Sequence, residues 1–137
     1  MPYWGSDMPA ITYHFINVPG AAHRAVEQGA RLYRKFTRLD SDGDPIDMTD
    51  WTARMQGRLS VESDLPLFDW TTDDYLTING TEGELVLDVP AEVTATLTFR
   101  TCVYDIELTD DAEPANTMRF AEGRMELSRE VTREVPT

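Results

Sequence analysis

The sequence is poor in cysteine and has no long apolar run. Cys102 is the only cysteine in 137 residues, which excludes an intramolecular disulfide and a zinc site built from cysteine ligands. No apolar stretch approaches the ~18 residues that cross a bilayer. The first ten residues carry Asp7 and lack a basic start, so we expect no secretory signal and folding in a cytoplasm.

Basic residues are also scarce. The chain has 12 Lys and Arg against 25 Asp and Glu, for a formal charge of −13 at pH 7. Phosphate backbones and anionic membranes bind clustered cations, so we expect neither nucleic acid nor a membrane as a partner. Residues 61–137 hold 18 of the acids and 5 of the bases. This asymmetry suits a protein with one face against a partner, or with basic neighbours, and it equally suits plain solubility.

The remaining composition is that of one folded domain. A chain of 137 residues is of single-domain size, and its apolar fraction of 41% is too high for a disordered segment. Alternating apolar and polar residues then predict strands, because neighbouring side chains in a strand point to opposite faces. In residues 100–108, for example, Cys102, Tyr104, Ile106 and Leu108 share one face.

The same alternation recurs along most of the chain. Between the runs lie turn-forming pairs such as Asn79-Gly80, and Pro90 begins a possible helical turn over residues 90–94. Strands are predicted at residues 29–38, 51–59, 66–70, 75–79, 84–89, 100–108 and 118–127. Short strands at this spacing predict an all-β sandwich or barrel. Most aromatic side chains, including Trp51, Trp70, Tyr75, Tyr104 and Phe120, are expected in its core.

The N-terminus differs from the rest of the chain. Two prolines and a glycine in the first ten residues disfavour helix and inner strand, although the segment is rich in large apolar side chains. We interpret it as an extended arm that docks on a neighbouring protein; the alternative is a terminus folded back on its own domain. The predicted contact residues are Pro2, Tyr3, Trp4, Met8, Pro9 and Ile11. The expected organisation is an arm and loop at 1–28, a sandwich at 29–133 and a tail at 134–137.

No motif predicts catalysis, a metal or a cofactor. Residues 40–47 (DSDGDPID) begin with calcium-loop spacing, but the sixth position is Pro45 and the twelfth is Trp51, where glycine and glutamate are needed. We predict a hairpin turn there, with positive φ at Gly43. His14 and His23 have no metal-binding spacing, and Cys102 is predicted to be a buried, inert thiol. We therefore expect that the protein is not an enzyme.

Four stretches in order resemble a family of small structural proteins of tailed bacteriophages. They are EQGA at 27–30 leading into DSDGDPID at 40–47, WTARMQ at 51–56, VYDIEL at 103–108, and EGRMEL at 122–127 closing with EVTR at 130–133. The resemblance implies an immunoglobulin-like antiparallel β-sandwich of about 7–9 strands. The chain departs from that family in its longer N-terminal lead-in and in residues 17–24.

The resemblance also implies a function without catalytic residues. It predicts a virion protein, assembled in the host cytoplasm, in the tail tip, baseplate or fibre attachment region. Its partners would be other virion proteins and copies of itself. Two alternatives stay open: a decoration protein on the capsid head, and a carbohydrate-binding module that uses an exposed aromatic such as Trp4 or Trp70.

Overall fold

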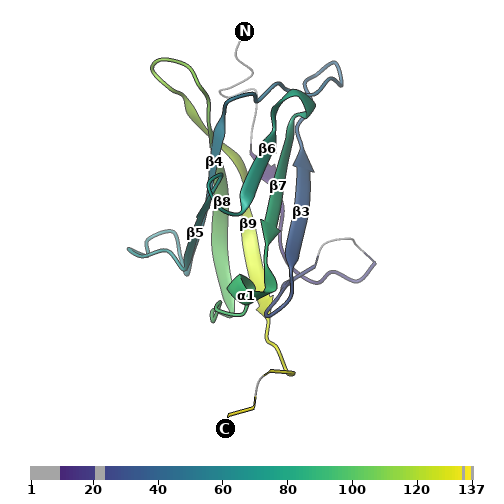
Figure 1. The fold of residues 1–137 in the computed structure, drawn as a ribbon, viewed down its shortest axis with the longest axis vertical. Coiled ribbons are helices and arrows are strands. Elements are labelled where there is room, and N and C mark those ends of the chain that lie inside the picture. The colour runs from purple at the N-terminus through teal and green to yellow at the C-terminus, as the bar shows by residue number, and fades with distance from the viewer. Residues whose placement is uncertain (1–9, 21–23, 134, 137) are drawn as a thin grey trace.

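The computed structural model describes residues 10–20, 24–133 and 135–136. In these ranges the chain forms nine strands, one 3-10 turn and one short helix (Figure 1). The elements are β1 (Ile11–Thr12), β2 (Val26–Glu27), β3 (Leu32–Thr37), β4 (Thr52–Arg58), β5 (Phe68–Thr71), β6 (Leu76–Asn79), η1 (Gly80–Glu82), β7 (Glu84–Val89), α1 (Ala91–Thr94), β8 (Thr101–Thr109) and β9 (Thr117–Ser128).

Two sheets pack face to face, which confirms the predicted all-β sandwich. The larger sheet has the order β1-β9-β8-β4-β5, with β2 also paired to β9, and the smaller sheet has the order β3-β7-β6. All pairs are antiparallel except those of β1 and β2 with β9. In Figure 1 β6 and β7 lie in front of the larger sheet with β3 beside them at the right, and α1 lies at the lower end of the sandwich.

The predicted alternation places the core correctly. Along β8 the inward residues are Cys102, Tyr104, Ile106 and Leu108, each at most 4% exposed. One irregularity was not predicted. The register between β8 and β9 shifts at Ile106, and as a result both Phe120 and Ala121 of β9 point inward. Such a bulge sets two residues of one strand against one residue of its neighbour.

The N-terminal segment differs from the expected arm and loop. From Ile11 onward it lies along the edge of β9, where β1 and β2 form two short parallel ladders. Phe15 between them is fully buried in the core. Ile11, predicted as an arm contact, pairs with Ala121 and packs against the core of its own domain. The other predicted arm contacts, Pro2 to Pro9, lie outside the described residues.

The acidic turn at residues 40–47 also needs a correction. The Asp40 carboxylate accepts hydrogen bonds from the amides of Asp42 and Asp44, and Gly43 has a φ of 86°. A single bridge between Leu39 and Pro45 closes the turn. The tight antiparallel turn, its positive φ at Gly43 and its Asp side-chain bonds are as predicted. The correction concerns the flanking strands: β3 and β4 belong to different sheets, so the turn joins the two layers and does not pair β3 with β4.

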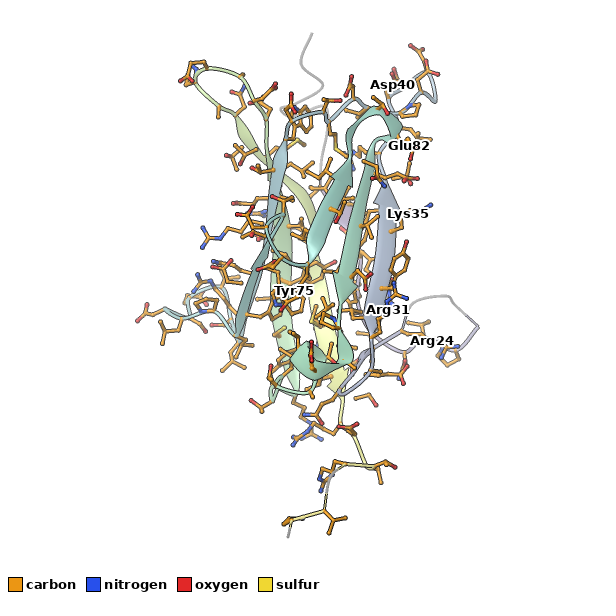
Figure 2. All side chains as sticks on the ribbon, in the orientation of Figure 1. Arg24, Arg31, Lys35, Asp40, Tyr75 and Glu82 are labelled. Carbon is orange, nitrogen blue, oxygen red and sulfur yellow. The ribbon has the colours of Figure 1, made fainter. Side chains whose placement is uncertain are left out.

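On the outer face of the smaller sheet, basic side chains at β3 are paired with carboxylates on β7. Arg31 forms two hydrogen bonds of 2.8 Å with the Asp88 carboxylate, and Lys35 lies 3.4 Å from Glu84. Figure 2 shows Arg31 and Lys35 one above the other along the β3 side of the molecule. The pairing with Arg31 lowers the pKa of Asp88, chiefly through the side-chain hydrogen bond. This face therefore presents matched charges to solvent.

Candidate protein-docking surface

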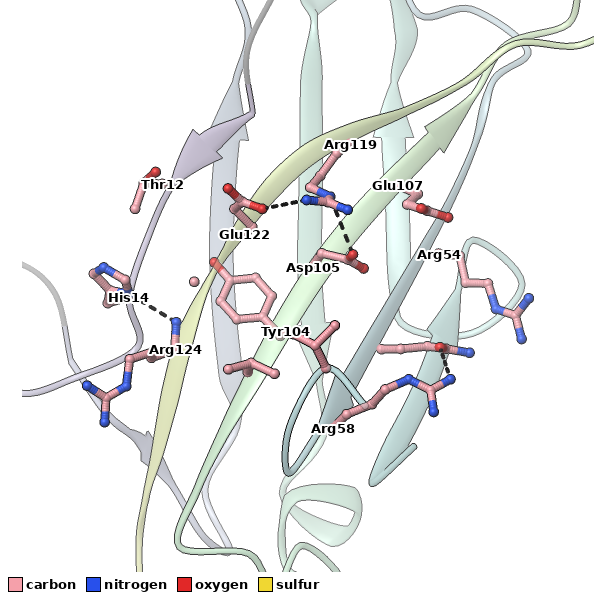
Figure 3. Close-up of a pocket in the computed structure, with 14 residues that line it drawn as sticks. Thr12, His14, Arg54, Arg58, Tyr104, Asp105, Glu107, Arg119, Glu122 and Arg124 are labelled. Carbon is pink, nitrogen blue, oxygen red and sulfur yellow. Dashed lines mark hydrogen bonds and ion pairs between the residues drawn. The ribbon is translucent and has the colours of Figure 1, made fainter. Parts of the chain in front are cut away.

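The outer face of the larger sheet is hollowed into a shallow groove of about 600 Å3 (Figure 3). Outward side chains of β9, β8 and β4 form its floor, with the β1 segment at one side and the β4–β5 loop at another. The lining residues are Thr12, His14, Arg54, Gln56, Arg58, Val61, Val103, Tyr104, Asp105, Glu107, Arg119, Glu122, Gly123 and Arg124. Most of them are charged or polar.

Strand register sorts the charges into rows across the sheet. The central row is acidic, because Asp105 on β8 lies opposite Glu122 on β9 and opposite Gln56 on β4. A basic row flanks it on each side. One contains Arg54, Glu107 and Arg119, and the other contains Arg58, Val103 and Arg124. Directly opposed residues on a sheet interact through their side chains, so each row acts as a unit.

The first basic row is neutralised within the protein. Arg119 bridges two strands, with its guanidinium 2.8 Å from Glu122 and 3.5 Å from Asp105. Arg54 forms two hydrogen bonds of 2.6 and 2.9 Å with the carboxylate of Asp69 on β5. The Arg54 hydrogen bond lowers the pKa of Asp69 more than any other influence. These two arginines already have anionic partners.

The arginines of the second basic row, unlike those of the first, are not ion-paired within the described chain. Neither Arg58 nor Arg124 forms an ion pair with a carboxylate among the residues described. Arg58 is held by neutral acceptors, since it donates to the Ser63 carbonyl at 2.8 Å and to the Gln56 amide oxygen at 3.0 Å. The two arginines flank Val103 from strands two apart, which separates their backbones by about 10 Å.

An exposed apolar loop borders this row. The β4–β5 connection carries Leu59, Val61 and Leu65, which are 64–80% exposed, and Val61 lines the groove. We call Arg58, Val61, Val103 and Arg124 the basic strip. It combines apolar side chains with two arginines that form no ion pair among the described residues. The charge of Arg58 still contributes to the lowered pKa of Asp69, so the positive charge of the strip is only partly compensated. Such a surface is suited to binding an anionic segment of another protein.

Thr12 and His14 of the N-terminal segment border the groove, and there the pairing of this segment with β9 is irregular. In a regular parallel ladder Tyr13 would donate to the Glu122 carbonyl and accept from the Arg124 amide. The first bond is present at 3.0 Å, but the Arg124 amide donates to His14 Nδ1 at 3.0 Å instead. The Tyr13 carbonyl accepts from the Tyr104 hydroxyl at 2.5 Å. His14 is therefore a structural residue at the edge of the groove.

Gly123 permits this arrangement. A Cβ at Gly123 would overlap the carbonyl of Tyr13, which turns inward across β9. Two residues on, Phe15 makes both ladder bonds, donating to Arg124 at 2.8 Å and accepting from Glu126 at 2.9 Å. The departure from a regular ladder is thus confined to one position, and glycine at that position is the reason the N-terminal segment can lie against β9.

The remaining residues considered from sequence fall outside the groove or serve the core. Trp70 is 4% exposed and stacks on Phe68 with ring centroids 4.1 Å apart, so its ring is not a platform for a sugar. Trp4 and His23 lie outside the described residues. Across the described ranges, no three His, Cys, Asp or Glu side chains gather as metal ligands would. No described helix has the length and apolar character to cross a bilayer.

Cys102 yields a direct chemical prediction. It is 3% exposed on the inner face of β8, and burial raises the pKa of its thiol to about 12. Because the thiolate is the reactive species, we expect labelling by a thiol reagent at pH 8 to be about 1000-fold slower in the folded protein than in urea. Mass spectrometry of labelled protein over time measures both rates, with Cys102→Ser as the blank. Fast labelling of the folded protein would contradict the burial.

The fold and the groove define a β-sandwich with a charged surface suited to protein binding. Comparison with protein-family models gives no match to this chain. A search of curated proteins likewise finds no matching relative.

Proposed function

We propose that this chain is a structural protein of a tailed-bacteriophage virion, an adaptor in the tail tip, baseplate or fibre attachment region, and not an enzyme. It acts by packing against other proteins through the basic strip. The observation that carries the docking role is the pair Arg58 and Arg124, the two arginines of the groove that form no ion pair with a described carboxylate, on a chain with a formal charge of −13. The virion assignment comes from the four sequence stretches described above.

Strand connectivity supports the immunoglobulin-like part of this proposal. An immunoglobulin sandwich sets strands G, F, C and C′ against strands B, E and D. In chain order these correspond to β9, β8, β4 and β5 facing β3, β7 and β6, which is the order found here. β1 and β2 then correspond to a first strand that pairs with the last one.

Reversing the charge of the basic strip tests the docking role. We expect Arg58→Glu/Arg124→Glu to reduce incorporation into particles at least tenfold. The protein should stay folded, with a melting temperature lowered by a few degrees, because the half-buried Arg58 loses its hydrogen bonds to the Ser63 carbonyl and to Gln56. Quantitative mass spectrometry of purified particles measures incorporation. The matched control is Arg100→Glu/Arg129→Glu, which makes the same change at two exposed arginines outside the groove. Equal incorporation of the two variants would contradict the proposal.

Copy number in the same particles separates the tail from the head. We expect a small multiple of three or six copies per particle, as in a symmetric tail assembly. Hundreds of copies would favour decoration of the capsid head, and absence from particles would reject the virion assignment. The carbohydrate-binding alternative loses Trp70 as its platform, because that ring is buried.

A further inference from the structure

The loop that joins β8 to β9 is an exposed anionic projection of the described chain. Residues 111–116 are all exposed, and residues 109–118 contain three acids and no base. In Figure 1 this loop extends away from the body of the sandwich at the upper left. We call residues 110–116 the acidic tip.

Hydrogen bonds to the Asp110 carboxylate order the acidic tip, and the carboxylates of Asp111 and Glu113 remain available to bind a partner. The Asp110 carboxylate accepts hydrogen bonds from the amides of Ala112 and Asn116 at 3.1 and 2.8 Å, and from the Asn116 side chain at 2.9 Å. Asp111 and Glu113 form no ion pair with any residue that the structure describes. Such preorganisation lowers the entropy lost when a loop binds.

The acidic tip and the basic strip of one molecule cannot meet. Val103 lies on the basic strip, and six residue steps along extended β8 lead from it to Thr109 at the base of the tip. At about 3.4 Å per residue this is roughly 20 Å along a rigid strand. Any contact between the two must therefore join separate molecules.

We propose that the partner of the basic strip is the acidic tip of a second copy of this chain, with Asp111 and Glu113 of one copy bound by Arg58 and Arg124 of the next. This deepens the proposed function and rests on it for the docking surface. Copies that each carry −13 repel one another at long range, so association needs a local match of opposite charges. Tip and strip are different surfaces, so the contact is heterologous and repeats around a ring or along a filament.

A charge-swap experiment on the purified full chain tests the partner. The strip variant is Arg58→Glu/Arg124→Glu, and the tip variant is Asp111→Arg/Glu113→Arg. Sedimentation velocity at low salt should show association of the wild type that weakens as salt is added. Each variant alone should associate at least tenfold more weakly, because its strip and tip then carry like charges.

Restoration is the decisive measurement. An equimolar mixture of the two variants should associate, because the acidic strip of one variant matches the basic tip of the other, and the basic strip of the second matches the acidic tip of the first. A single chain with all four substitutions should regain self-association. The matched control is Asp42→Arg/Asp44→Arg, the same charge change in another exposed acidic turn, which should associate at least as well as the wild type.

Two results would overturn the inference: a wild type that stays monomeric at every concentration tested, or a mixture that associates no better than each variant alone. If the strip variant still fails to enter particles in either case, the docking surface stands and its partner is another protein. If the strip variant enters particles normally, the proposed function itself fails.

Discussion

Phe15→Ala is expected to lower the free energy of unfolding by about 3–5 kcal/mol, the range typical of a large aromatic side chain removed from a core. Phe15 is fully buried although it precedes β2 in a segment without regular structure of its own. Its ring packs edge-on against Tyr13 and Tyr104, at centroid distances of 5.0 and 5.1 Å, and the Arg34 guanidinium lies 5.5 Å away. Urea denaturation followed by tryptophan fluorescence measures the change.

Further variants test whether the N-terminal segment belongs to the sandwich domain, which was predicted to begin at residue 29. Val18→Ala, at a 41% exposed residue of the same segment, should change stability by less than about 0.5 kcal/mol. Deleting residues 1–15 should cost at least as much as Phe15→Ala. A cost below about 1 kcal/mol for Phe15→Ala would contradict the packing of this segment in the core and would favour the predicted arm and loop before residue 29.

Gly123→Ala should destabilise the protein by about 2–3 kcal/mol, which is the upper part of the range for overpacked sites. The added methyl group would overlap the Tyr13 carbonyl, and backbone cannot move aside as the end of a flexible side chain can. The substitution also disturbs the Tyr104 hydroxyl bond to that carbonyl and the Arg124 amide bond to His14. Equilibrium denaturation measures the loss, and amide exchange at Arg124 locates it.

Matched variants separate overlap from the loss of a hydrogen bond. Tyr104→Phe keeps the ring and removes only the hydroxyl, so it should cost about 1–2 kcal/mol. Gly43→Ala meets no neighbouring atom but has a φ of 86°, so it should cost about 1 kcal/mol from backbone strain alone. If Gly123→Ala were no worse than Gly43→Ala, the close approach of the N-terminal segment to β9 would be wrong.

The elements with the clearest period-two pattern were predictable. β4 and β8 place a buried residue inward at every second position, β9 turns alternate residues inward on either side of its bulge, and the short helical turn after Pro90 appears as α1. The segment from Ile11 to Glu27 was not predictable in the same way. Its β1 and β2 are two residues long each, too short for any alternation to be visible, and they depend on hydrogen bonds to β9 more than 100 positions away.

The candidate site could be predicted only in part. Alternation assigns Arg58 and Arg124 to outward faces of their strands, so their exposure follows from sequence. Nothing local says that Val103 lies between them, or that Arg54 and Arg119 find carboxylates while these two do not. Charge rows are a property of register between strands, and register depends on which strands become neighbours.

The amino-acid sequence by itself determined the fold class, the apolar core of the strands and the burial of Cys102, because apolar periodicity dictates which side chains leave water. Only the tertiary structure decided that the N-terminal segment from Ile11 onward belongs to the sandwich and that, of the four arginines in the groove, Arg58 and Arg124 form no ion pair with a described carboxylate. Both results depend on contacts between residues far apart in the chain. Such contacts arise from sheet order and strand register, which local preferences do not encode.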